Sequence, residues 1–136
     1  ALQSPEAPAV AAQFEAVAAP GPDVAPAATE RLATQVSYLL QRGDAALAAL
    51  RLSEPFADSA AANYTAVLAI DAQNAEARRG LERIVTAYTG LARSALQRGD
   101  TRYARQLLAR ARTVLPGSVE LQQLEQEIGN APAAGP

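Results

Sequence analysis

The side chains of this sequence that could take part in chemistry are arginines and a few carboxylates. The chain contains no His, Cys, Met, Trp or Lys. Without these types it has no imidazole or thiolate metal site, no Cys or Ser-His nucleophile, no Schiff-base lysine and no disulfide. The remaining carboxylate groupings are Glu54 with Asp58, and Glu120 with Glu125 and Glu127. We interpret them as helix-end and solvent-facing acids, and we predict no enzyme activity, no cofactor and no metal site.

The arginines are concentrated in the middle of the chain. Residues 72–112 hold nine arginines and three acidic residues, a net charge of +6, whereas the whole chain has a formal charge of −2. Such a basic block attracts an acidic partner, a phosphate polymer or an anionic lipid surface. Nucleic acid is disfavoured because only Tyr88 and Tyr103 offer aromatic rings among these arginines and no nucleic-acid motif is present.

The composition indicates one helical domain. In 136 residues, 49% are hydrophobic but only 4% are aromatic, so the apolar content is mostly alanine and leucine. Alanine and leucine favour closely packed helices over a sheet. No run approaches the roughly 20 apolar residues of a membrane span, so any membrane contact would come from parts outside this chain.

The ends of the chain differ in composition from its middle. Residues 1–28 carry five prolines among small residues, which predicts a flexible linker. A short helix over residues 9–19 would place Val10, Phe14 and Val17 on one face. This segment is either a plain spacer or a peptide that docks on the domain. We expect the domain itself to span residues 29–129 and residues 130–136 to form a disordered tail.

Apolar spacing and capping residues predict five helices and no strands. A glycine inside the first helix, Gly43, could mark a turn with Asp44, but we favour one continuous helix with Ala45–Ala49 as a packing face. The second Arg-Gly-Asp triplet contains Gly99 and Asp100, which we interpret as a turn and an N-cap rather than an adhesion motif. The expected helices run from Thr29 to about Leu52, from Asp58 or Ser59 to near Asp71, from Asn74 to Gly99, from Asp100 or Thr101 to Leu115, and from Ser118 past Ile128.

The chain also repeats itself. A shift of 44 residues superimposes Ala60, Tyr64 and Val67 on Ala104, Leu108 and Ala111, as expected for two equivalent helices of a helical-hairpin array. The residues that follow a known repeat pattern are Tyr88, Leu91, Ala92, Ala95, Ala104, Leu108, Ala111 and Pro116. In this respect the chain resembles the tetratricopeptide repeat (TPR) family. The resemblance implies an all-α, TPR-like α-solenoid of two helical hairpins plus a C-terminal capping helix.

The resemblance also implies which residues pack and which bind. The expected packing residues are Ala60, Tyr64, Val67, Tyr88, Leu91, Ala92, Ala104, Leu108, Ala111 and Pro116. In the family, the first helices of successive hairpins line a concave groove that grips peptides. The corresponding positions here, with two arginines one turn earlier, are Arg79, Arg83, Thr86, Thr89, Arg93, Leu96 and Gln97. Their three arginines could hold an acidic or C-terminal carboxylate segment, or they could simply be solvated.

We therefore expect a non-catalytic adaptor or scaffold domain that binds a protein or peptide through a basic concave groove. Arginine without lysine, with abundant alanine and proline, indicates a GC-rich bacterial genome. The Ala/Pro-rich spacer resembles those that tether envelope domains. The expected location is the bacterial periplasm or envelope, within a larger envelope or secretion/assembly protein, with the cytoplasm as the alternative. Two other functions stay open: homodimerisation through the Ala-rich first helix, and binding of an anionic glycan or lipid surface.

Overall fold

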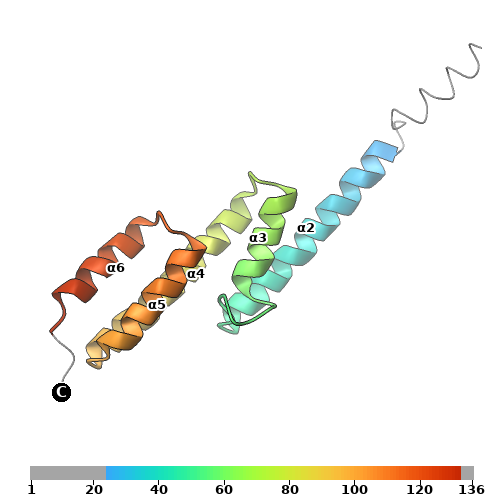
Figure 1. Cartoon of the computed structure of the whole chain (residues 1–136). Coiled ribbons are helices and arrows are strands. Elements are labelled where there is room, and N and C mark those ends of the chain that lie inside the picture. Colours follow the sequence, from blue (N-terminus) through green and yellow to red (C-terminus); the bar gives the residue numbers. More distant parts are fainter. Residues whose placement is uncertain (1–23, 133–136) are drawn as a thin grey trace, which may run out of the picture. The chain divides into compact units, whose positions relative to one another are not determined.

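A computed structural model describes residues 24–132. Within these residues the chain forms five α-helices and no strand (Figure 1), which confirms the predicted helix count and all-helical class. The predicted short helix at residues 9–19 and most of the predicted C-terminal tail lie outside the described residues. The chain divides into two compact units, Ala1–Gln35 and Val36–Pro136. The five helices are α2 (Val24–Ala48), α3 (Ala60–Ile70), α4 (Ala75–Gln97), α5 (Thr101–Val114) and α6 (Val119–Asn130).

Side-chain caps start the central helices where the sequence predicted them. Ser59 Oγ accepts a hydrogen bond from Ala62 N (3.0 Å) at the start of α3, and Asn74 Oδ1 accepts one from Ala77 N (2.9 Å) at the start of α4. At α5 the cap is Asp100, whose Oδ1 accepts from Tyr103 N at 3.1 Å. Gly99 has a φ of +78°, a conformation in which only glycine avoids a steric cost, and it ends α4 as predicted.

Both ends of α2 differ from the prediction. The helix begins at Val24 rather than at Thr29, so residues 24–28 are helical. Pro26 is tolerated there because the first turn of a helix has N–H groups without intrahelical partners. The helix ends at Ala48, before the predicted Leu52, since Leu50 takes the left-handed conformation with a φ of +59°.

The hydrogen bonds around Leu50 explain this early end. Arg51 N donates to Ala46 O (2.9 Å) and Leu50 N donates to Leu47 O (3.0 Å). This pair of bonds is the Schellman motif, which satisfies carbonyls at a helix C-terminus. The turn directs Leu52 and Ser53 inward, where both are buried. Burial of Leu52 therefore accompanies the end of the helix.

Gly43 lies inside α2, so the predicted continuous helix is confirmed. The predicted alanine packing face is wrong: of the four alanines in Ala45–Ala49 only Ala46 is buried. With 3.6 residues per turn, only one of these closely spaced alanines can point at the core. Gly43, Ala46 and the half-buried Leu47 form the inward face.

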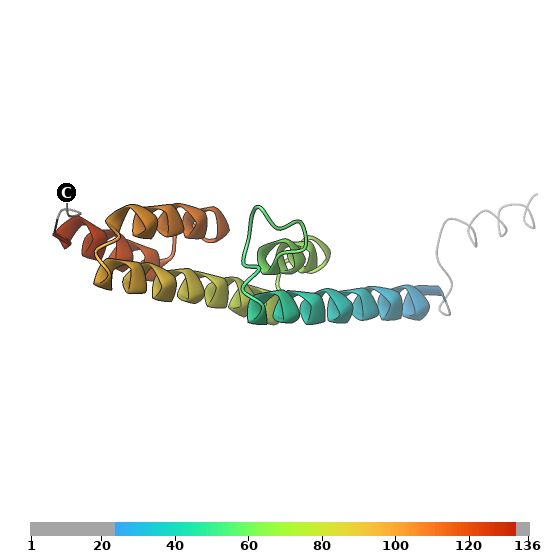
Figure 2. The same cartoon turned by 90° about the horizontal axis from the view of Figure 1, so that it is seen from below.

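Helix α4 is the centre of the compact unit and packs against α3, α5 and α6. The short turn at residues 98–100 makes α4 and α5 an antiparallel hairpin, and Figure 2 shows α3 and α5 on the same side of α4. The largest fully buried side chains include Tyr64, Ile84, Leu107, Leu121 and Leu124.

Eight of the ten predicted packing residues are buried, namely Ala60, Tyr64, Val67, Tyr88, Ala92, Ala104, Leu108 and Ala111. Leu91 and Pro116 are exposed, so neither belongs to the buried core. Leu91 lies at the edge of the buried stripe of α4, next to the exposed Ser94, and Pro116 lies in the turn that follows α5. Proline ends a helix through its backbone and does not need a covered side chain to do so.

The Tyr64 side chain is fully buried in the core. Its ring lies between two glycines: an ideal Cβ on Gly43 would come within 2.7 Å of the ring, and one on Gly80 within 2.5 Å. The hydroxyl donates a hydrogen bond to Asp44 Oδ1 at 2.5 Å. Burial, and then the bond to Asp44, raise the pKa of Tyr64 above its ordinary value. Gly43 and Gly80 therefore let α2 and α4 approach this ring from two sides.

The loop between α2 and α3 is anchored by buried and exposed polar contacts. The hydroxyls of Ser53 and Tyr88, both buried, share a hydrogen bond. Asp58 accepts from Asn63 Nδ2 (2.8 Å) and forms an ion pair with Arg42 (2.7 Å). These two contacts, Asn63 first, lower the pKa of Asp58. Asp58 thus lies directly before the N-cap residue of α3, which fits the interpretation of this carboxylate as a helix-end acid.

Candidate functional site

The predicted groove on α4 lies largely against α6. Thr86 Oγ1 donates to Glu120 Oε1 at 2.9 Å. Arg93 binds Glu127 through two hydrogen bonds, of 2.9 and 3.0 Å. Each of these contacts joins residues that are 34 positions apart in the chain. Helix α6 therefore follows this face of α4 in a constant register.

The other predicted groove residues differ in exposure. Thr89 is buried (1% exposed), and Leu96 is half-buried against the core. Thr89 cannot touch a partner, and its assignment to the binding surface was wrong because it lies between Thr86 and Arg93, on the part of α4 that α6 follows. Arg79, Arg83 and Gln97 are exposed. Neither of the two arginines forms an ion pair with another residue of the described range 24–132. The structure does not assemble the seven residues into one open surface.

Replacing Thr89 with valine is expected to raise the free energy of unfolding by about 1 kcal/mol. The Thr89 hydroxyl is buried and has no hydrogen-bond partner among residues 24–132, so it loses its hydration without compensation. Valine has nearly the same shape and no polar atom to desolvate. Urea denaturation followed by circular dichroism measures the change. The control is Thr86→Val on the same helix, whose hydroxyl is exposed and bonded to Glu120, and which should not stabilise the fold. Equal effects of the two variants would contradict this explanation.

The Arg93 and Glu127 pair predicts a change in the titration of one carboxylate. The hydrogen bond from Arg93 is the main cause that lowers the pKa of Glu127. A lowered pKa gives a stabilisation that is present above the unfolded-state pKa and is lost as the pH falls through the folded-state pKa. Because both side chains are largely exposed, we expect this contribution to be small.

In Arg93→Gln, the pKa of Glu127 is expected to rise towards the ordinary value of about 4.3. Carboxyl ¹³C NMR over a pH titration measures this directly. Arg112→Gln is the control, because Arg112 pairs with Glu125 and not with Glu127. A pKa of Glu127 that is the same in all three proteins would show that the ion pair is not formed in solution.

The acidic residues of α6 contact side chains of α4 and α5. Besides the contacts of Glu120 and Glu127 with α4, Glu125 forms an ion pair with Arg112 of α5 (2.5 Å). The three carboxylates thus point to separate partners. Among residues 24–132, no group of three or more metal-ligating side chains comes together. This arrangement is that of a docked helix.

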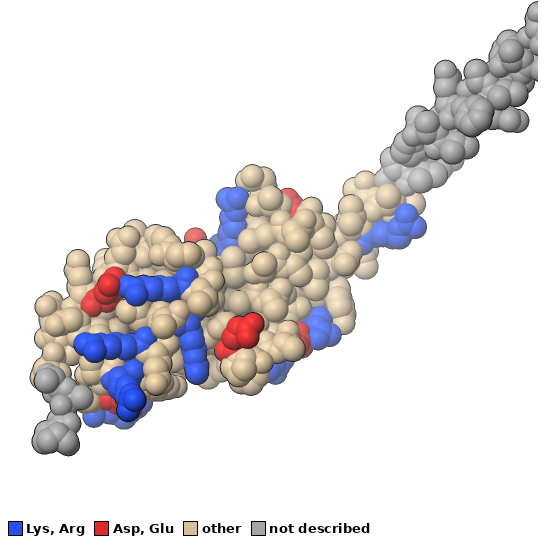
Figure 3. Space-filling view, viewed as in Figure 1, with Lys and Arg blue, Asp and Glu red and all other residues tan. Residues whose placement is uncertain are grey.

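A second set of arginines lies on α5. Arg102, Arg105 and Arg110 are exposed, and none of them forms an ion pair with a carboxylate of the described chain. Figure 3 shows basic side chains gathered over the α4–α5 hairpin on the face that carries α5. The basic block in the sequence thus becomes an open basic surface here.

This surface borders a groove. Two adjoining hollows, with volumes of about 600 and 360 Å³, run between α5 and the C-terminal half of α6 and share Arg105, Ala109, Ile128 and Gly129. We call them together the α5–α6 groove. Arg102 and Arg105 line it at one end, and Arg112 at the other end holds Glu125. Ala109 and the buried Ile128 give it an apolar part.

Sequence reasoning missed this groove, although part of the signal was present. Arg102, Arg105 and Arg112 follow helical spacing and so share one side of α5. Helix α6 forms the other wall of the groove, and its position beside α5 cannot be predicted from a local sequence pattern.

Comparison with family models, curated proteins and solved structures found no match to this chain. No helix in the described part is both long and apolar enough to cross a membrane.

Proposed function

We propose that this chain is a non-catalytic protein-interaction module that binds an acidic segment of a partner protein in the α5–α6 groove. The observation that carries the proposal is the row of arginines along the groove. Arg112 already holds a carboxylate, whereas Arg102 and Arg105 line an open hollow and hold none from the described chain. Guanidinium groups bind carboxylates through paired hydrogen bonds, which favours an acidic ligand.

Helix α6 supports the choice of partner because it shows how an acidic helix binds this hairpin. Its Leu121, Leu124 and Ile128 are buried, and its carboxylates bond to side chains of α4 and α5. The open part of the groove offers the same combination, an apolar floor beside arginines. The matching segment has one or two apolar side chains for Ala109 and Ile128 and carboxylates at the spacing of Arg102 and Arg105.

The TPR-like part of the proposal rests on the arrangement of the hairpin. Helices α4 and α5 are antiparallel, α3 and α5 lie on the same side of α4, and α4 contacts α6 at a constant offset of 34 residues. The TPR family has this repeat length. A preformed helical scaffold loses little conformational entropy on binding, so its groove charges can determine which segment binds. A role within a bacterial envelope or assembly protein rests on the composition alone.

The experiment measures fluorescence anisotropy of labelled 12-residue helical peptides that carry an apolar stripe and two glutamates three residues apart, the spacing of Arg102 and Arg105. We expect binding to the native chain that weakens as salt rises, and at least a tenfold loss in Arg102→Glu/Arg105→Glu, or about 1.4 kcal/mol. The matched control is Arg79→Glu/Arg83→Glu, which changes the net charge equally on the α4 face predicted from the sequence.

The outcomes separate the two surfaces. Loss of binding only in the α5 double variant supports the proposal. Loss only in the α4 double variant would place the partner on the face predicted from the sequence. Equal binding of peptides with glutamine in place of glutamate would refute an acidic partner. Binding of anionic vesicles instead of peptides would favour the lipid-surface alternative.

Self-association is a second candidate because large apolar side chains of the compact unit are exposed. Tyr38 on α2 and Leu50 and Phe56 in the loop after it are about half exposed. Light scattering at increasing concentration tests this candidate: a rise to twice the monomer mass, lost in Tyr38→Ser/Phe56→Ser, would support a dimer through this surface.

A further inference from the structure

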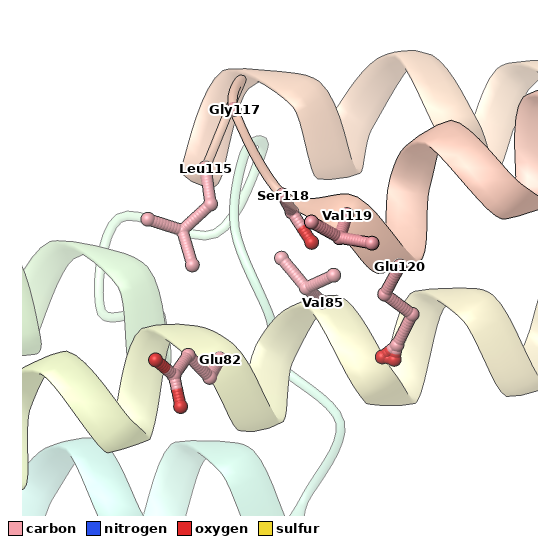
Figure 4. A pocket seen from close by; sticks show the side chains of 7 residues that line it. All are labelled: Glu82, Val85, Leu115, Gly117, Ser118, Val119 and Glu120. Atoms are coloured by element: carbon pink, nitrogen blue, oxygen red, sulfur yellow. The ribbon is translucent and has the colours of Figure 1, made fainter.

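A pocket of about 470 Å³ lies between α4 and the turn that joins α5 to α6, and it shares no residue with the α5–α6 groove. Figure 4 shows Val85 on α4 facing Leu115 and Val119 across the pocket. The carboxylates of Glu82 and Glu120 lie on either side of Val85 (Figure 4). The pocket thus combines apolar walls with an acidic rim.

The charge of this pocket is opposite to that of the rest of the hairpin. Of the residues that the structure describes, no arginine lines it. Glu82 is exposed and forms no ion pair with a residue of the described range. Glu120 accepts its hydrogen bond from the neutral hydroxyl of Thr86 and forms no ion pair with a residue of the described range, although its charge helps to raise the pKa of Arg93. The C-terminus of α5 and the N-terminus of α6 meet at the pocket, and the opposite partial charges of these two helix ends largely cancel. The two carboxylates therefore make the electrostatic potential of the pocket negative.

We propose that this pocket binds an arginine side chain of a partner protein. The aliphatic part of that side chain packs on Val85, Leu115 and Val119. Of these three, Val119 is 66% exposed in the free chain. The guanidinium reaches the carboxylate of Glu82, with Glu120 on the other side of the rim. Arginine fits better than lysine because its planar, weakly hydrated head group can lie against apolar walls while it donates paired hydrogen bonds.

Methyl ¹H–¹³C NMR of the full chain tests this site, with N-acetyl-arginine amide as the ligand and N-acetyl-citrulline amide as its uncharged isostere. We expect saturable shifts of the Val85, Leu115 and Val119 methyl groups with the arginine compound. The loss of one exposed ion pair predicts that the native chain binds the citrulline compound about fivefold more weakly than the arginine compound. For the same reason, Glu82→Gln should bind the arginine compound about fivefold more weakly than the native chain does. Glu76→Gln removes an exposed carboxylate elsewhere on α4 and should leave the affinity unchanged.

Three results would overturn the proposal: no saturable shift of these methyl groups, equal affinity for the arginine and citrulline compounds, or equal affinity of the native chain and Glu82→Gln. The test is independent of the proposed binding of acidic peptides, because Arg102→Glu/Arg105→Glu alters no residue of this pocket. If that double variant loses the acidic peptide but still binds the arginine compound, the two sites are separate. If it loses both ligands, the pocket is not the arginine site.

Discussion

Gly80→Ala is expected to lower the free energy of unfolding by about 2 to 3 kcal/mol, the upper part of the range for overpacked cores. The added methyl group would lie 2.5 to 2.6 Å from three atoms of the Tyr64 ring, far inside contact distance. The ring cannot withdraw, because Gly43 closes its other side and its hydroxyl is bonded to Asp44. The higher helix propensity of alanine offsets only part of this cost.

The matched control is Gly90→Ala, almost three turns further along the same helix. Beyond the adjoining helix backbone, an added Cβ there would meet no atom of the described residues within 4 Å. There we expect stabilisation of about 0.5 to 1 kcal/mol, since only the conformational freedom of glycine is removed. Urea denaturation of both variants measures the difference. In a Tyr64→Leu background, the cost of Gly80→Ala should largely disappear because the ring that it strikes is gone. Destabilisation of similar size at Gly80 and Gly90, or an unchanged cost without the ring, would contradict the clash.

Leu124→Ala is expected to cost about 3 kcal/mol, a typical value for removing a buried leucine side chain. Leu124 is fully buried on the inward face of α6, between Leu121 and Ile128. The three ion pairs or hydrogen bonds of α6 are exposed and add little by comparison. The leucine face therefore supplies most of the free energy that docks α6 on the hairpin.

Urea denaturation and amide hydrogen exchange measure this effect, with the exposed neighbour Gln123→Ala as the control. Protection in α6 should fall more than protection in α4 and α5. Because α6 forms one wall of the α5–α6 groove and the rim of the acidic pocket, this variant should also weaken binding of both the acidic peptide and the arginine compound. Full binding with an undocked α6 would show that neither site needs this helix.

The local structure of this chain could be predicted well because its signals are local. Ser59, Asn74 and Asp100 stand at helix starts where their side chains satisfy free backbone N–H groups, and Gly99 adopts a φ that other residues avoid. The apolar spacing of α4 and α5 likewise identified most of the buried residues. The end of α2 was less predictable: Leu50 has a side chain that disfavours its left-handed conformation, and only the burial of Leu52 and Ser53 accounts for the turn.

The candidate site was predictable only in its charge. The sequence places nine arginines in residues 72–112, and charge is a property of composition that survives any packing. Which of these arginines stay open is decided by pairing across helices. Arg93 and Arg112 are engaged by Glu127 and Glu125 of α6, whereas Arg102 and Arg105 line a groove. Those pairings join residues that are far apart in the chain, so no local pattern can assign them.

The sequence by itself thus determined the helices, their caps and a basic central block, because propensity, capping and charge act within a few residues. Three features depend on the tertiary structure alone. The Tyr64 ring packs between Gly43 and Gly80, and Thr89 is buried. Helix α6 packs on one face of α4 and leaves a groove beside α5. The physical reason is that packing depends on which surfaces of separate helices fit each other. That fit is settled by side-chain volumes and pairings summed over the whole compact unit.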